Sequence, residues 1–108
     1  MNFIILNALH ALQMLLALNE CTEWGRIAIL NSLARYRARD EKQAEHICER
    51  VAPQFQHVNA SVVLAAVKAV FLHMKFVGPE LGKTYLKKMA PPLGRFNIPF
   101  TRKSIANE

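Results

Sequence analysis

His46 and Cys48 are the pair of side chains in this sequence that comes nearest to a metal site or a nucleophile with its base. Residues two apart on a helix point to different faces, so these two side chains do not converge on one atom. Cys48 also falls on an apolar stripe, where cysteine behaves as a small hydrophobic residue. The other histidines have no cysteine or carboxylate at a matching spacing: His10, His57 and His73. We therefore expect no catalytic residue, no metal site and no cofactor.

Other chemical motifs are equally sparse. The sequence has no Gly-rich phosphate loop and no paired-carboxylate arrangement. Asn59 begins a glycosylation sequon, but it also precedes a long apolar run as a helix cap would, and no secretory signal is present. Cys21 and Cys48 lack the spacing of a disulfide framework, which favours a reducing, cytosolic environment. The apolar stretch 1–18 is interrupted by polar residues and predicts a buried helix rather than a membrane segment.

The formal net charge of +6 raises the question of an anionic partner. The basic groups are separated by the acidic stretch 40–49, so no uniform basic stripe crosses the chain. Lys83, Lys87 and Lys88 form a compact group on adjoining rows of one predicted helix. This group is a candidate site for anionic lipid, and the alternative is a solvated helix face.

Helical periodicity runs through most of the chain, and no stretch shows the two-residue alternation of a half-buried strand. The pattern predicts an all-α fold, with helices over about residues 3–18 and 22–36, a third beginning at Asp40, a fourth from Asn59 to Gly78, and a fifth over about 80–89. The third helix should be half buried and the fourth, apolar nearly all round, should be central. Pro91 and Pro92 mark either a break or the start of another helix. Residues 94–108 are expected to form an irregular, flexible tail.

The predicted caps Thr22 and Asn59 are 37 residues apart, and each opens a pair of helices. This self-similarity predicts a right-handed α-solenoid of stacked helical hairpins, of the HEAT or armadillo kind, with about two repeats over residues 1–93. Trp24 and Gly25 stand at the entrance of the second helix. We expect the Trp24 ring to be buried between adjacent hairpins, with Gly25 allowing their backbones to approach closely.

Two repeats are fewer than the about three that a solenoid needs for independent stability. The apolar first helix has little sequence before it to cover it. We therefore expect the chain to self-associate or to depend on partner subunits.

Four stretches together resemble one known family: "ALNECTEWGRIAIL", "EHICERVAP", "NASVVLAAVKAVF" and "YLKKMAPPL". They are similar to the trunk of beta-adaptin, the large beta subunit of clathrin-associated adaptor complexes, over about Leu12 to Leu93. The resemblance implies a non-catalytic scaffold that acts in vesicle-mediated protein transport, in coat assembly and cargo sorting. It implies the other adaptor-complex subunits as partners. It also implies a cytoplasmic chain, peripheral on the cytosolic face of Golgi, endosomal or plasma membranes.

The sequence departs from the family after Leu93, where the family continues with another apolar helix. In the family, clathrin binds chiefly through a linker and an appendage that this sequence does not contain. We therefore interpret the chain as an internal fragment of the trunk with a divergent tail. The alternatives are a basic helical-repeat module that binds phosphoinositide membranes or nucleic acid, or a non-functional truncated product. The balanced charges of 40–49 and the lack of alternating exposed aromatic residues argue against nucleic acid.

Overall fold

The computed structural model describes residues 8–98 of the chain, and this part is helical. Its α-helices are α1 (Ala8–Ala17), α2 (Glu23–Arg35), α3 (Glu41–Val51), α4 (Ala60–His73) and α5 (Pro79–Arg95). Short 3-10 helices follow three of them: η1 (Leu18–Glu20), η2 (Ala52–Gln56) and η3 (Met74–Phe76). Residues 8–98 contain no strand, which confirms the predicted all-α class. The predicted start of the first helix, at residue 3, lies outside the described residues.

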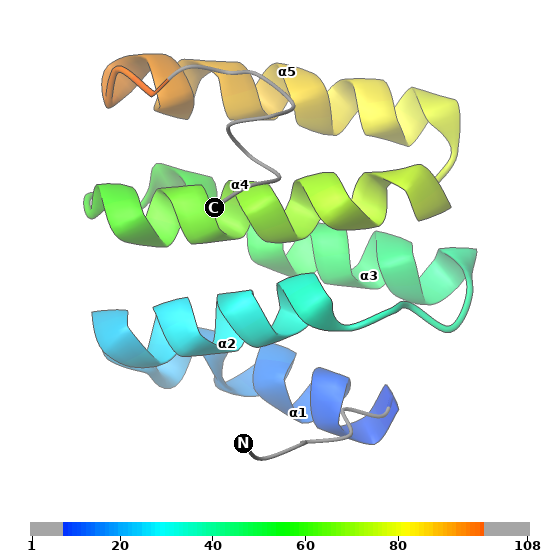
Figure 1. Cartoon of the computed structure of the whole chain (residues 1–108). Coiled ribbons are helices and arrows are strands. Elements are labelled where there is room, and N and C mark those ends of the chain that lie inside the picture. Colours follow the sequence, from blue (N-terminus) through cyan, green and yellow to red (C-terminus); the bar gives the residue numbers. More distant parts are fainter. Residues whose placement is uncertain (1–7, 99–108) are drawn as a thin grey trace.

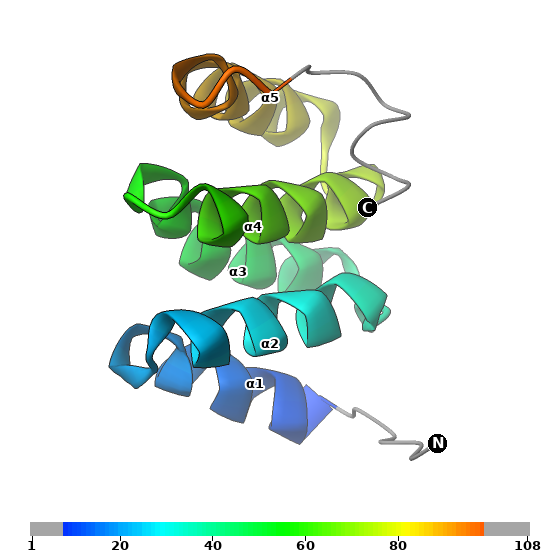
Figure 2. The same ribbon diagram turned by 60° about the vertical axis from the view of Figure 1, so that its left-hand side comes forward.

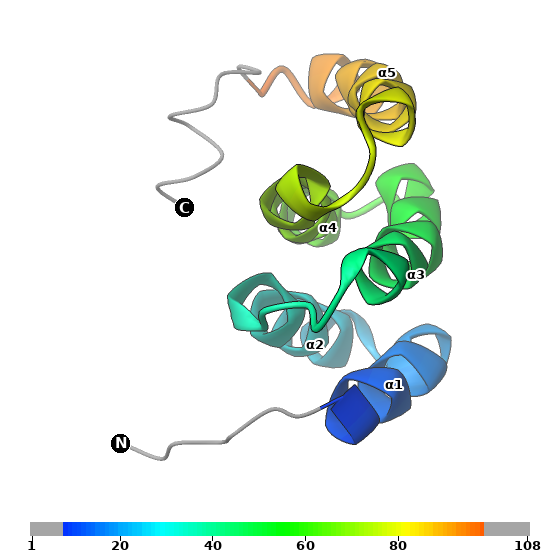
Figure 3. The same cartoon turned by 90° about the vertical axis from the view of Figure 1, so that its right-hand side faces the viewer.

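The helices stack in chain order from α1 to α5 (Figure 1). Seen from the side, α1, α3 and α5 form one layer, and α2 and α4 form the other (Figure 3). Helices α2 and α4 run in the same direction and lie side by side, as the turned view also shows (Figure 2). The pairs α2–α3 and α4–α5 are therefore two stacked hairpins, which confirms a solenoid of about two repeats.

Side-chain caps fix where the helices begin. Thr22 Oγ1 accepts a hydrogen bond from Gly25 N at 3.2 Å, and Asn59 Oδ1 accepts one from Ser61 N at 2.8 Å. Asn59 Nδ2 also donates to Glu23 Oε1 at 2.7 Å, so the caps of the two repeats lie next to each other. The 37-residue interval seen in the sequence is thus a real structural register between α2 and α4.

Asp40 and Gln43, three residues apart at the start of α3, have the spacing of a capping box, but the structure differs from that motif in one detail. Asp40 Oδ1 accepts from Gln43 N at 2.8 Å, as expected. Gln43 Oε1, however, accepts from Arg39 N at 2.6 Å and from the Tyr36 hydroxyl at 2.9 Å, rather than from the Asp40 amide. Because Tyr36 ends α2, this second contact joins the two helices of the hairpin.

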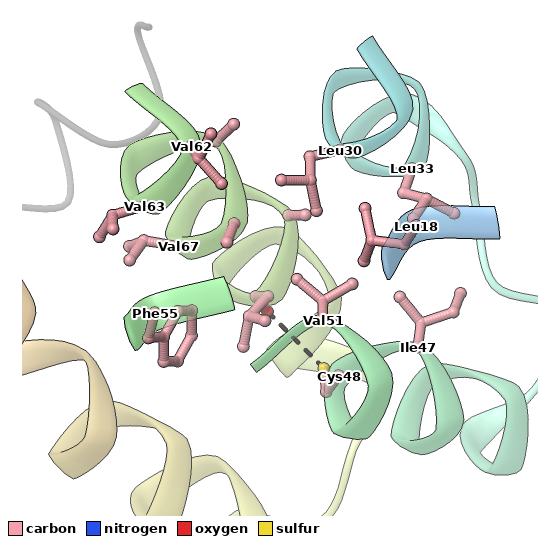
Figure 4. Close-up of a cluster of buried hydrophobic side chains, with 14 of the residues drawn as sticks. Leu18, Leu30, Leu33, Ile47, Cys48, Val51, Phe55, Val62, Val63 and Val67 are labelled. Carbon is pink, nitrogen blue, oxygen red and sulfur yellow. Dashed lines mark hydrogen bonds between the residues drawn. The ribbon is translucent and has the colours of Figure 1, made fainter. Parts of the chain in front are cut away.

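The core is built around α4, and side chains from the neighbouring elements converge on it (Figure 4). Helix α4 is central, and the buried stripe of α3 makes that helix half buried, both as predicted. The stripe consists of Ala44, Ile47, Cys48 and Val51. The buried residues of α4 are Val62, Val63, Ala65, Ala66, Val67, Ala69, Val70 and His73.

The prediction that the fifth helix ends near Met89 is wrong, because α5 continues through Pro91 and Pro92 to Arg95. Proline has no N–H, so the carbonyls of Lys87 and Lys88 lose their usual helical partners. Burial offsets this cost, since Pro92 and Leu93 both lie inside the fold. Tertiary packing, rather than local preference, extends the helix here.

Residues 94–98 are ordered by a helix-ending motif, so the expected irregular tail does not begin at residue 94. Asn97 has φ = 58°, a left-handed conformation that asparagine tolerates better than most residues. Ile98 N donates to Leu93 O at 2.8 Å, and Asn97 N donates to Gly94 O at 3.0 Å. This pair of bonds is a Schellman motif, in which Ile98 also packs against the core. Residues 99–108 lie outside the described residues.

His73, at the end of α4, lies inside the core. It is 1% exposed, and its Nε2 lies 2.8 Å from Leu33 O, which joins the end of α4 to the end of α2. This geometry suits a neutral imidazole that donates from Nε2. Within the described residues Nδ1 has no partner, so a proton there would be a buried, unpaired donor.

We expect His73 to make folding stability depend on pH. Burial lowers the pKa of His73 in the folded chain, and the nearby Lys75 charge adds to this effect against the opposing hydrogen bond to Leu33. The unfolded chain then binds the proton more readily than the folded chain. The contribution of neutral His73 to the free energy of unfolding is therefore fully present above a pH of about 6.5 and is lost as the pH falls below that value. Urea unfolding of the wild type and His73→Gln at several pH values tests this. The free energy of unfolding of the variant should depend less on pH than that of the wild type. An equal dependence on pH in both proteins would contradict the assignment of this effect to His73.

Candidate functional site

Trp24 lies on the surface and is 83% exposed, so the prediction that it is buried between adjacent hairpins is wrong. The second position of α2 points away from the side that carries Leu30 and Leu33, and those two leucines fill the interface instead. The sequence shows a large ring at a helix entrance, but only the rotation of α2 in the stack decides which way it faces. Trp24 is therefore available for contact with another molecule.

Gly25 is needed for a close approach, but to a different neighbour from the one expected. A Cβ atom at this position would lie 2.9 Å from Cys21 Cβ and 3.3 Å from Cys21 Sγ. The approach is within the turn that opens α2, and not to the backbone of another hairpin. The spacing of four residues between Cys21 and Gly25 is the sequence signal that could have indicated it.

Arg26 and Gln54 form a polar junction between the α1–α2 turn and η2. Arg26 donates from Nη1 to Gln54 Oε1 at 2.9 Å, from Nε to Cys21 O at 3.1 Å, and from Nη2 to Asn19 O at 3.1 Å. Gln54, only 4% exposed, completes the network by donating from Nε2 to Asn19 Oδ1 at 2.9 Å. Nothing in the sequence indicated this role for Arg26, because its partner Gln54 is 28 residues away.

The three candidate lysines do not converge on one point. All are exposed on α5, but only Lys87 and Lys88 line a groove of about 550 Å³ between α5 and η2. Lys83 and Lys87 are four residues apart and share the outward side of the helix. Lys88 Nζ lies 5.5 Å from the Tyr85 ring centroid, and the carboxylate of Glu49 also lines the groove. The arrangement suits diffuse attraction of anions better than a pocket for one phosphate.

Two titratable groups in the core are held in their neutral forms. Burial, followed by the charge of Glu45, raises the pKa of the Cys48 thiol to about 12, which disfavours the reactive thiolate. Burial is also the largest cause that raises the pKa of Tyr85, with smaller contributions from Cys48, Glu49 and Glu45. Residues 8–98 contain no cluster of three His, Cys, Asp or Glu side chains that could hold a metal ion. The described part of the chain also has no helix with the length and apolar character to cross a membrane.

Residues 1–72 match a family model described as Cnd1, non-SMC mitotic condensation complex subunit 1. The chain is 54% identical over 82 residues to the AP-1 complex subunit beta of Dictyostelium discoideum, which covers 75% of this chain and 9% of that protein. It is 48% identical over 94 residues to the mouse AP-1 complex subunit beta-1, covering 85% of this chain and 10% of the mouse protein. The yeast AP-1 complex subunit beta-1 is 42% identical over 81 residues, covering 75% of this chain and 11% of that protein.

The chain belongs to the Cnd1 family, and its identities to AP-1 beta subunits are those of a beta-adaptin fragment. The identities to beta subunits extend over three quarters of the chain or more, so they decide the closer relationship. Mitotic condensation appears in the description of the family model, and we do not infer that role for this chain. The chain spans about a tenth of the length of the curated relatives that it matches.

The described part of the chain offers surfaces of the stack, rather than a group of reactive side chains, as its candidate site. In the described part of this adaptin chain, polar contacts such as Arg26–Gln54 join one element to another. Exposed groups such as Trp24 and Lys87 lie on the outside of α2 and α5. The candidate functional site is therefore a set of contact faces.

Gly25→Ala should destabilise the fold although alanine is the better helix former. The new Cβ atom would require the Cys21 side chain and its turn to move, so we expect a loss of about 1–2 kcal/mol in the free energy of unfolding. Chemical denaturation measures it. Gly94→Ala is the matched control, because no atom lies within 4 Å of its added Cβ and the substitution should stabilise α5 by about 0.5–1 kcal/mol. Equal effects of the two substitutions would contradict the close approach at Gly25.

Proposed function

We propose that this chain is a non-catalytic scaffold segment of a clathrin-adaptor beta subunit that acts in vesicle-mediated intracellular protein transport. The observation that carries the proposal is the 42–54% identity, over at least three quarters of the chain, to AP-1 beta subunits. The partners would be the other subunits of the adaptor complex. Clathrin would be contacted through other regions of the subunit, and the location would be the cytosolic face of Golgi, endosomal or plasma membranes.

The exposed face of α1 supports a scaffold role. Leu9, Leu12 and Leu16 are exposed and recur every three or four residues, so they form one apolar row at this end of the stack. At the opposite end, the outward face of α5 carries Lys83 and Lys87 instead. A solenoid gains stability where such an apolar face is covered by a neighbouring repeat or a partner subunit. The first part of the apolar stretch 1–18, residues 1–7, lies outside the described residues.

A segment exchange tests whether the chain can act as part of an adaptor trunk. Residues 12–93 would replace the matching stretch of the mouse AP-1 beta-1 subunit, expressed together with the other subunits of that complex. We expect the chimera to co-purify with them in a stoichiometric complex, because the core and junction residues retain their positions. The control carries Leu33→Asp, which places a charge in the core and should abolish assembly. If limited proteolysis shows that the chimera is folded but the chimera does not enter the complex, the result would favour the alternative that this chain is a non-functional product.

We propose anionic membrane binding through Lys83, Lys87 and Lys88 as a second function, supported by their exposure on one helix. Replacing all three with Gln should weaken binding to phosphoinositide-containing vesicles, with each lysine contributing about 1 kcal/mol at low salt. Vesicle co-sedimentation of the chain measures this. A matched control replaces Lys42, Arg50 and Lys75 with Gln, which changes the net charge equally at other exposed positions. The same loss in both variants would show that net charge, rather than this site, attracts the membrane.

A further inference from the structure

We propose that the outward face of α2 and α4 binds one amphipathic helix of a protein partner, with carboxylates at one end of that helix. Trp24 would make the main apolar contact, and Arg35 would pair with the carboxylates. The inference uses only the shape and charge of this face, so it holds or fails independently of the adaptor assignment.

Trp24 begins a continuous stripe along α2. Trp24, Ala28, Asn31 and Arg35 follow each other at intervals of three or four residues, which places them on one side of the helix. The stripe extends over three turns, or about 16 Å. An indole that is 83% exposed at its end is the kind of side chain that dominates binding energy in protein interfaces.

A groove of about 420 Å³ runs between α2 and α4 beside this stripe. Ile27 and Leu64 occupy equivalent positions 37 residues apart, and each contributes an apolar wall. Leu72 adds apolar surface, while the small residues Ala34, Ser61 and Ala65 let another backbone approach closely. Because α2 and α4 are parallel neighbours (Figure 3), the groove between them has the shape that accepts a third helix.

The charges along this face differ between its two ends. Arg35 and Lys68 line the groove, and none of the described residues lining it carries a carboxylate. Around Trp24, by contrast, Glu20 is exposed and Glu23 is bonded to Asn59. A partner helix with its acidic residues at one end would therefore bind in one orientation, with those residues beside Arg35.

Other anionic ligands fit this face less well. Two cations next to leucine, isoleucine and alanine side chains give few contacts for the successive phosphates of a nucleic acid. The groove lies on the α2–α4 layer, away from the lysines of α5, so it is separate from the proposed lipid-binding surface (Figure 3). A partner helix with an apolar face and an acidic end would match both the apolar walls of the groove and its two cations, Arg35 and Lys68.

The single tryptophan makes the proposal directly measurable. The probe is a 16-residue amphipathic peptide with leucines on one face and three glutamates in its last two turns, titrated into the 108-residue chain. Binding should shift the emission of Trp24 to shorter wavelength as the indole leaves water. A peptide in which lysines replace the glutamates should bind at least about tenfold more weakly.

Variants locate the binding surface, with a labelled peptide and fluorescence anisotropy as the readout. Trp24→Ala and Arg35→Glu should each weaken binding of the acidic peptide at least about tenfold, and Arg35→Glu should improve binding of the lysine peptide. Val58→Ala and Arg50→Glu are matched controls that should leave both affinities unchanged, since Val58 is also 83% exposed and neither residue lines the groove. Circular dichroism verifies that each variant keeps its helices.

Several results would overturn the proposal. Equal affinity for the two peptides, or unchanged affinity in both groove variants, would exclude a charged helix at this face. Equally tight binding of heparin would indicate a general polyanion surface. Emission of Trp24 that depends on protein concentration would identify a second copy as the occupant, and a shift caused only by deleting residues 99–108 would identify that segment.

Discussion

The enclosure of α4 is the constraint on which the rest of this structure depends. This helix is apolar nearly all round, so it is stable only where other elements cover most of its surface. The side that lines the groove with α2 is partly open, at Leu64, Lys68 and Leu72. Leu30 and Leu33 of α2, Ile47 and Val51 of α3, and Phe55 of η2 converge on it (Figure 4). The two-layer arrangement follows from this requirement, because a single hairpin cannot surround its own first helix.

Polar contacts then set how the hairpins are registered against each other. Apolar packing alone tolerates sliding, whereas a hydrogen bond between buried groups is lost after a small shift and leaves an unsatisfied donor or acceptor. The contact of His73 with the Leu33 carbonyl is of this buried kind and joins the ends of α2 and α4, while an exposed hydrogen bond from Asn59 to Glu23 joins their starts. Arg26 and Gln54 hold η2 to the turn before α2. These contacts lie at both ends of the interface that α2 and α4 share.

A stack whose helices are joined in this way suits a protein that works through its surfaces. Cys48 and His73 are enclosed in the core, and burial raises the pKa of the Cys48 thiol to about 12. The exposed features differ between the faces instead: an apolar row on α1, lysines on α5, and Trp24 beside a basic groove on the α2–α4 layer. Distinct faces on one segment can contact different neighbours simultaneously.

The sequence by itself determined the features that depend on neighbouring residues. The caps Thr22, Asp40 and Asn59 were readable because each bonds within its own first turn, and the stripe of α3 followed from helical periodicity. Tertiary structure alone decided where Trp24 points, because the rotation of α2 is set by its packing on α4. The tertiary structure also decided that α5 continues through Pro91 and Pro92, where burial of Leu93 offsets the lost hydrogen bonds. The physical reason is range: capping and periodicity act over about four residues, whereas orientation and burial depend on partners that are dozens of residues away.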